Sequence, residues 1–164
     1  MSRNSDEGKE KIMTTANQNN VNARKTLDSL LGARKETLSL YTELASLRPF
    51  KEEQEVSVVL QEFCETLMDY TASAHFQLYR FLEDGSERRA NVRDLAEKIY
   101  PEISMTTEQF LDFNDKYEEE KEGVHFSSLG NDLSSLGEIL ADRIVYEDQV
   151  ISAFEAPKSE SAVA

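Results

Sequence analysis

Residues 51–84 read KEEQEVSVVLQEFCETLMDYTASAHFQLYRFLED, and this stretch decides the fold. Apolar and small side chains recur in it at spacings of three and four residues, at Val56, Leu60, Phe63, Leu67, Tyr70, Ala74, Leu78 and Phe81. Residues at these spacings lie on one face of an α-helix, so the pattern predicts a long amphipathic helix whose stripe faces a core. We expect it to begin near Lys51 and to end at Asp84-Gly85.

The regions on either side of this helix carry the same kind of pattern. A first helix is expected from about Asn22 to Leu47, and Arg48-Pro49 ends it because the residue before a proline disfavours helical geometry. A last helix is expected from about Ser127 or Ser128 to Phe154. Leucines and isoleucines supply its stripe.

Between the second and the last helix, the pattern predicts two shorter helices. One carries apolar residues over positions 92–99 and is closed by Tyr100-Pro101. The segment Ser104–Glu108 offers a new N-cap, and the second short helix follows it as far as Tyr117, before a break at Gly123. We expect these two helices to pair as one rod of the bundle.

The predicted fold is therefore all-α: an up-and-down helical bundle with a four-helix core and an additional short helix. Three segments follow from composition. Residues 1–20 are polar, Asn-rich and aperiodic, which predicts a disordered N-terminal extension. Residues 21–156 form the bundle domain, and residues 157–164 form a flexible C-terminal tail behind a proline.

The charge of the chain limits its partners. Among 164 residues, 32 acidic and 18 basic side chains give a formal net charge of -14. This charge repels nucleic-acid phosphates and anionic lipids, so neither nucleic acid nor a membrane is expected as a direct partner. Two interpretations stay open: the charge serves solubility alone, or it serves recognition of a basic protein.

The expected location is the cytoplasm. The sequence has no run of 18 or more apolar residues and no apolar stretch of signal-peptide type among its first twenty residues. The lone Cys64 can form neither an internal disulfide nor a thiolate metal site.

The residues offer little catalytic chemistry. The Glu-x-x-His motif of bundle metal sites occurs once, at Glu122 and His125, and it straddles the expected break at Gly123. Cys64 and His75 share a helix but lie roughly 16 Å apart along its axis, too far for a catalytic pair. We therefore expect no enzyme, with no catalytic, cofactor-binding or metal-ligating residues and no cofactor.

The second helix carries an acidic ridge. Glu62, Glu65 and Asp69 are spaced by three and four residues, which places their carboxylates on one face. Ser73 and Phe76 extend this face and make it partly apolar. The ridge either is a solvated surface or binds a basic helix.

Several separated motifs, in one order, resemble the Rsd/AlgQ family. The second helix has Phe63-Cys64, Leu67-Met68-Asp69-Tyr70 and Ser73-Ala74-His75-Phe76 followed by Tyr79. The last helix adds Leu133-Ser134, Gly137-Glu138, Leu140, Arg143 and Glu147-Asp148, and the first region adds Asp28, Leu31, Arg34-Lys35 and Pro49. The resemblance covers roughly residues 28–154. The sequence departs from the family in having Leu30 where a tryptophan is expected, in having no tryptophan at all, and in its longer N-terminal extension.

This resemblance implies an anti-sigma factor. Such a protein binds the C-terminal, -35-recognising domain of the primary sigma factor, blocks its association with core RNA polymerase and promoter DNA, and favours alternative sigma factors in stationary phase. The expected partner-binding residues are Glu62, Glu65, Asp69, Tyr70, Ser73 and Phe76, and a monomer is expected in the complex. The alternative is a helical adaptor that regulates a metabolic or stress-signalling partner such as the phosphotransferase carrier HPr, without strong sigma binding.

Overall fold

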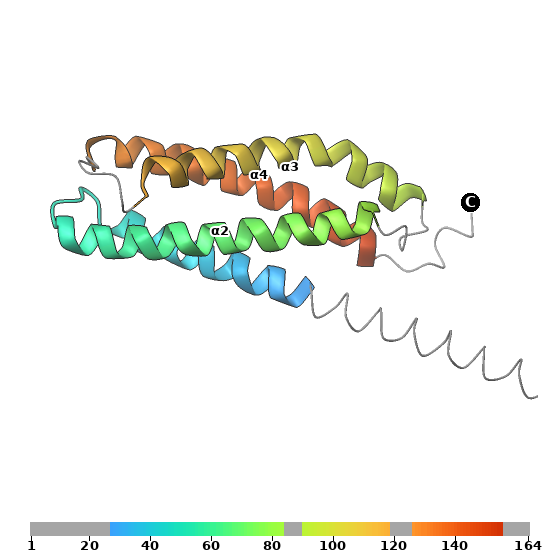
Figure 1. Ribbon diagram of the computed structural model, residues 1–164, viewed down its shortest axis with the longest axis horizontal. Helices are drawn as coiled ribbons and strands as arrows, with labels where there is room; N and C mark the ends of the chain where they lie inside the picture. The colour runs from blue at the N-terminus through green and yellow to red at the C-terminus, as the bar shows by residue number, and fades with distance from the viewer. Residues whose placement is uncertain (1–26, 84–89, 119–125, 156–164) are drawn as a thin grey trace, which may run out of the picture.

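Four long helices make up the computed structural model, which describes residues 27–83, 90–118 and 126–155 (Figure 1). They are the first helix (residues 27–46), α2 (Glu53–Glu83), α3 (Ala90–Lys116) and α4 (Leu129–Glu155), with a 3-10 turn, η1 (Phe126–Ser128), before α4. Successive helices run in opposite directions, as an up-and-down bundle requires (Figure 1). The described residues contain no strand. The all-α bundle predicted from the sequence is thus confirmed.

A tight turn joins the first helix to α2. The amide of Leu47 donates to the carbonyl of Leu44 at 3.1 Å, and the amide of Phe50 donates to that of Leu47 at 2.8 Å. Pro49 lies within this turn, as predicted, and Phe50 has a positive φ of 59°. α2 then begins at Glu53 with carboxylates in its first turn, where the helix dipole favours negative charge.

The two short helices predicted over residues 92–117 are one continuous helix, and the expected break at Pro101 was wrong. Pro101 is exposed on the outer side of α3. Because proline has no amide hydrogen, the carbonyl of Glu97 lacks its helical donor, and water can hydrogen-bond to it there instead. The helix curves along its length (Figure 1). The hydroxyls of Thr106 and Thr107 donate back to the carbonyl of Ile103 at 2.6 and 3.2 Å, so they do not cap a new helix. α3 as a whole is the fourth rod, and the only short helical element among the described residues is η1.

The predicted apolar stripe of α2 forms the centre of the core. Its described members are all buried: Val56, Leu60, Phe63, Leu67, Tyr70 and Ala74. The ring of Phe63 meets that of Phe113 from α3 edge to face, with centroids 5.9 Å apart. Leu30, which stands where a tryptophan was expected, is buried in the same cluster. A smaller apolar cluster, Ile99, Ile103 and Val150, joins α3 to α4.

The predicted N-terminal extension and C-terminal tail lie outside the described residues, as do the Glu122–His125 motif and Gly123. The described helices include none that is long and apolar enough to cross a membrane.

Candidate functional site

The outer face of α2 brings together five of the six residues expected to bind a partner. Glu62, Glu65 and Asp69 are exposed along it, and Ser73 is partly exposed one turn further on. Phe76 follows with 67% of its surface exposed, although it is a large aromatic residue. We call Glu62, Glu65, Asp69, Ser73 and Phe76 the acidic strip. It lies opposite the face of α2 that packs in the core.

Tyr70 does not belong to this strip. Its side chain is completely buried, and its hydroxyl donates a hydrogen bond to the Oε1 atom of Glu147 on α4. One residue of helix turns a side chain by about 100°, which takes Tyr70 from the face of Asp69 to the core. The structure therefore places Tyr70 beneath the strip, where it cannot contact a partner directly.

A shallow groove runs beside the strip, between α2 and the first helix. It has a volume of about 270 Å³ and is lined by Glu36, Ser39, Leu40, Glu62, Glu65 and Thr66. Near it, the hydroxyl of Thr37 contacts the carbonyl of Thr66 at 3.5 Å and so joins the two helices. The groove adds the carboxylate of Glu36 to those of the strip. Sequence reasoning missed Glu36, because helical periodicity within α2 says nothing about which neighbouring residue faces it.

The carboxylates of the strip are not neutralised locally. From residue 52 to residue 79 the sequence contains neither lysine nor arginine. In the described part of the chain, the basic side chains that form ion pairs do so elsewhere, as with Arg34 and Asp148 or Lys116 and Asp132. Within the described residues, Glu65 accepts a hydrogen bond of 3.3 Å from the neutral side-chain amide of Gln61, which does not cancel its charge. The strip thus presents a net negative surface to an approaching molecule.

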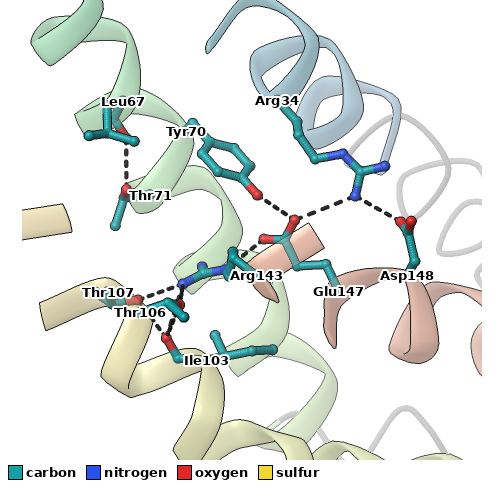
Figure 2. Close-up of polar contacts among 10 residues, drawn as sticks. All are labelled: Arg34, Leu67, Tyr70, Thr71, Ile103, Thr106, Thr107, Arg143, Glu147 and Asp148. Carbon is teal, nitrogen blue, oxygen red and sulfur yellow. Dashed lines mark hydrogen bonds and ion pairs between the residues drawn. The ribbon is translucent and has the colours of Figure 1, made fainter. Parts of the chain in front are cut away.

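Tyr70 belongs to a buried polar network on the core side of α2 (Figure 2). Arg143 and Glu147 of α4 are 0% and 1% exposed and form an ion pair of 2.9 Å. The Nη1 atom of Arg143 donates to the carbonyl of Ile103 at 3.1 Å and to the hydroxyls of Thr106 and Thr107 at 2.9 and 2.8 Å. These bonds tie α4 to α3.

The network also reaches the first helix and the surface. Arg34 lies 3.5 Å from Glu147 and donates to the exposed Asp148 at 2.8 Å (Figure 2). Burial raises the pKa of the Tyr70 hydroxyl, and the negative charge of Glu147 raises it further, so Tyr70 stays a neutral donor. The network therefore joins all four helices. The sequence motifs included Arg143, Glu147 and Asp148 but gave no sign that two of these charges are buried.

Two kinds of group in the described residues bear on catalysis: possible metal ligands and the single cysteine. No group of three or more histidine, cysteine or acidic side chains in them could hold a metal ion. Cys64 is buried, and desolvation raises its thiol pKa to about 12, with smaller contributions from Glu118 and Glu65. At neutral pH this group is a thiol and not the thiolate that acts as a nucleophile.

The fold and the strip define the class of this protein: an acidic four-helix bundle that presents a charged surface on one helix. The family described as "Regulator of RNA polymerase sigma(70) subunit, Rsd/AlgQ" matches residues 11–155. The chain belongs to this Rsd/AlgQ family, which is a family of regulatory proteins and not of enzymes.

Three similar proteins carry the same name. "Regulator of sigma D" of Yersinia pseudotuberculosis is 32% identical over 129 residues, which cover 76% of each chain. The protein of the same name from Enterobacter sp. (strain 638) is 31% identical over 133 residues, covering 79% of this chain and 80% of the relative. That of Shigella dysenteriae is 30% identical over 132 residues, covering 79% and 83%. No solved structure matches this chain.

Proposed function

We propose that this protein is an anti-sigma factor that binds the C-terminal, -35-recognising domain of the primary sigma factor. Binding there prevents the sigma factor from joining core RNA polymerase and promoter DNA. Alternative sigma factors then gain access to the polymerase, which is useful in stationary phase. The protein acts in the cytoplasm, as one monomer on one sigma domain. Membership of a family of sigma(70) regulators supports the proposal that the partner is a sigma factor.

The acidic strip of α2 is the observation that carries this proposal. A helix that recognises DNA holds basic side chains that contact phosphates. Glu62, Glu65 and Asp69 offer carboxylates to the same side chains, and no ion pair within the described residues competes for them. Charge complementarity of this kind speeds association and selects the partner. Phe76, with two thirds of its surface exposed, supplies an apolar anchor beside the charges.

Calorimetric titration of the full chain with the isolated C-terminal domain of the primary sigma factor tests the proposal. We expect one-to-one binding that weakens when the salt rises from about 0.1 M to about 1 M, since the screening length falls from about 10 Å to about 3 Å. A matched pair of variants locates the charges. Glu62→Gln with Glu65→Gln should weaken binding at low salt and reduce its salt dependence, whereas Glu138→Gln with Asp142→Asn, an exposed acidic pair on α4, should change little.

Absence of binding by a folded sample at high concentration would contradict the proposal. Titration with HPr would then test the adaptor alternative directly. Binding that is tight but independent of salt would retain the partner and exclude the acidic strip as its contact surface.

A further inference from the structure

The outer face of α2 contains, among its described positions, one more exposed large hydrophobic residue, Val58, which the acidic strip does not include. Val58 is 54% exposed and lies four residues before Glu62. The order Val58, Glu62, Glu65, Asp69, Ser73, Phe76 has spacings of three and four throughout, so all six positions form one ridge along the helix. The ridge is thus longer than the acidic strip.

This ridge has a definite pattern: an apolar residue at each end and three carboxylates between them. Val58 and Phe76 are 18 positions apart, which is roughly 27 Å along a helix. Single exposed apolar side chains are common on any protein surface. Met105 on α3 and Val145 on α4 are as exposed as Val58, at 58% and 55%, but neither lies on this ridge.

The groove beside α2 adds a place for a long basic side chain. It borders the ridge at Glu62 and Glu65, in the middle of the acidic part, and Glu36 of the first helix lines it from the other side. Leu40 provides apolar surface in the same groove, against which the methylene stem of a lysine or arginine can pack while its charged end meets the carboxylates.

We infer that the whole outer face of α2 receives a single basic amphipathic helix that lies along it. Basic side chains of that helix meet Glu62, Glu65 and Asp69, one of them enters the groove at Glu36, and an apolar side chain near each end packs on Val58 or Phe76. The occupant is taken to be a helix because a DNA-recognising domain, the proposed partner, presents a basic helix, and five turns of helix span the roughly 27 Å between Val58 and Phe76. The inference rests on the proposed function for the identity of the partner, and it adds the direction and length of the contact.

Four serine variants of the full chain test this inference. Val58→Ser and Phe76→Ser remove the two apolar ends, while Met105→Ser and Val145→Ser are matched controls at equally exposed apolar positions. Each is titrated with two probes. One is the isolated C-terminal domain of the primary sigma factor. The other is a helix-stapled synthetic peptide of about 22 residues, long enough to span the ridge, with lysines and arginines in its middle turns and a leucine near each end. A stapled peptide of the same composition in scrambled order controls for charge alone.

We expect Val58→Ser and Phe76→Ser each to weaken binding of both probes by about fivefold or more, as loss of a buried apolar contact does, with the controls within about twofold. We also expect the scrambled peptide to bind more weakly than the ordered one.

If sigma binding depends on Phe76 and not on Val58, the full-length contact is overturned while the proposed function stands. If the sigma domain does not bind but the ordered peptide does, with both ends required, the proposed function fails and the docking surface stands. If neither probe binds, the inference is overturned.

Discussion

The hydroxyl of Tyr70 donates a hydrogen bond to the carboxylate of Glu147 inside the bundle, and this contact connects α2 to α4. Tyr70 follows Asp69 directly in the chain, so one residue faces the core and its neighbour faces the proposed partner. The Tyr70 contact opposes rotation of α2 about its own axis and so keeps the acidic strip outward. Arg143 and Arg34 in turn hold Glu147 from two other directions.

Neutralising Glu147 should destabilise the fold strongly. Glu147→Gln leaves Arg143, which is fully buried, without its opposite charge, and breaking a buried pair in this way costs about 3–5 kcal/mol. Asp148→Asn is the matched control, because Asp148 is half exposed and pairs with Arg34 near solvent, where a pair contributes about 1 kcal/mol or less. Urea unfolding followed by circular dichroism measures both.

A double variant separates the charge effect from loss of packing. Arg143→Met with Glu147→Leu removes both charges and keeps apolar volume, so it should recover most of the stability that Glu147→Gln loses. If the double variant is less stable than Glu147→Gln, the network is not a compensated charge pair. Its hydrogen bonds to α3 would then contribute more than the pairing itself.

Helical periodicity predicted the elements that a single amphipathic pattern determines. The core stripe of α2 from Val56 to Ala74, and the limits of α4 within two residues, follow from apolar spacing alone. Pro101 misled the prediction, because a proline at the exposed surface of a helix is tolerated when water reaches the freed carbonyl. Sequence shows that Pro101 is present but does not show that it faces solvent.

The candidate site likewise contains residues that sequence spacing predicts and residues that it does not. The strip from Glu62 to Phe76 follows from spacing within one helix, whereas Glu36 and Arg143 owe their places to packing between helices. Tyr70 entered the predicted contact set through its place beside Asp69 in a motif. A motif gives neighbours in sequence, and neighbours on a helix point in different directions.

A methyl group added at Gly137 should destabilise the bundle. A Cβ atom there would lie 2.2 Å from the hydroxyl of Tyr41, which donates to the carbonyl of Leu133 at 2.8 Å. Gly137→Ala therefore forces the ring to move, at a cost of about 1–3 kcal/mol, although alanine is the better helix former. Gly32→Ala is the matched control, since nothing lies within 4 Å of its Cβ position, and it should stabilise by up to about 1 kcal/mol.

Removal of the opposing hydroxyl tests the cause of this effect. In a Tyr41→Phe background, the atom nearest the added methyl is absent, so Gly137→Ala should cost less than it does in the wild type. An equal cost in both backgrounds would assign the clash to the aromatic ring at position 41, whose Cζ atom would lie 2.9 Å from the added methyl, and not to the hydroxyl. Thermal and urea unfolding of the four proteins gives the comparison.

Cys64 should resist alkylation in the folded protein. The residue is 6% exposed, and the pKa of its thiol is raised to about 12 by desolvation and the nearby acids, so little thiolate forms at neutral pH. It is the only cysteine, so the label reports this site alone. Iodoacetamide should react rapidly in denaturant and very slowly without it. Fast labelling of the native chain would show that the region around Cys64 opens readily.

The same shift gives stability a pH dependence. A folded pKa of about 12 lies above the ordinary value of 9.0, so the folded state holds the proton more tightly. This contribution is present below pH 9 and is lost as the pH rises toward 12. Cys64→Ala should therefore lose less stability than the wild type between these pH values. Parallel loss in both proteins would assign the alkaline destabilisation to other groups, such as the tyrosines.

Asp69→Ala should weaken binding to the sigma domain without changing the fold. Asp69 is exposed in the middle of the acidic strip, so its removal leaves no buried group without a partner. Loss of a central charged contact should lower the affinity by about tenfold, or about 1.4 kcal/mol, at low salt. Asp142→Ala, which removes an exposed carboxylate from α4, is the matched control and should leave the affinity nearly unchanged.

Calorimetry and thermal unfolding of the two variants distinguish the roles of Asp69. Reduced affinity with an unchanged melting temperature assigns Asp69 to the partner contact. A parallel loss of affinity and melting temperature would make Asp69 a structural residue of α2, which its exposed position does not predict. Unchanged affinity in Asp69→Ala, with binding still sensitive to salt, would move the contact to another acidic face, and a loss of affinity in Asp142→Ala would place it on α4.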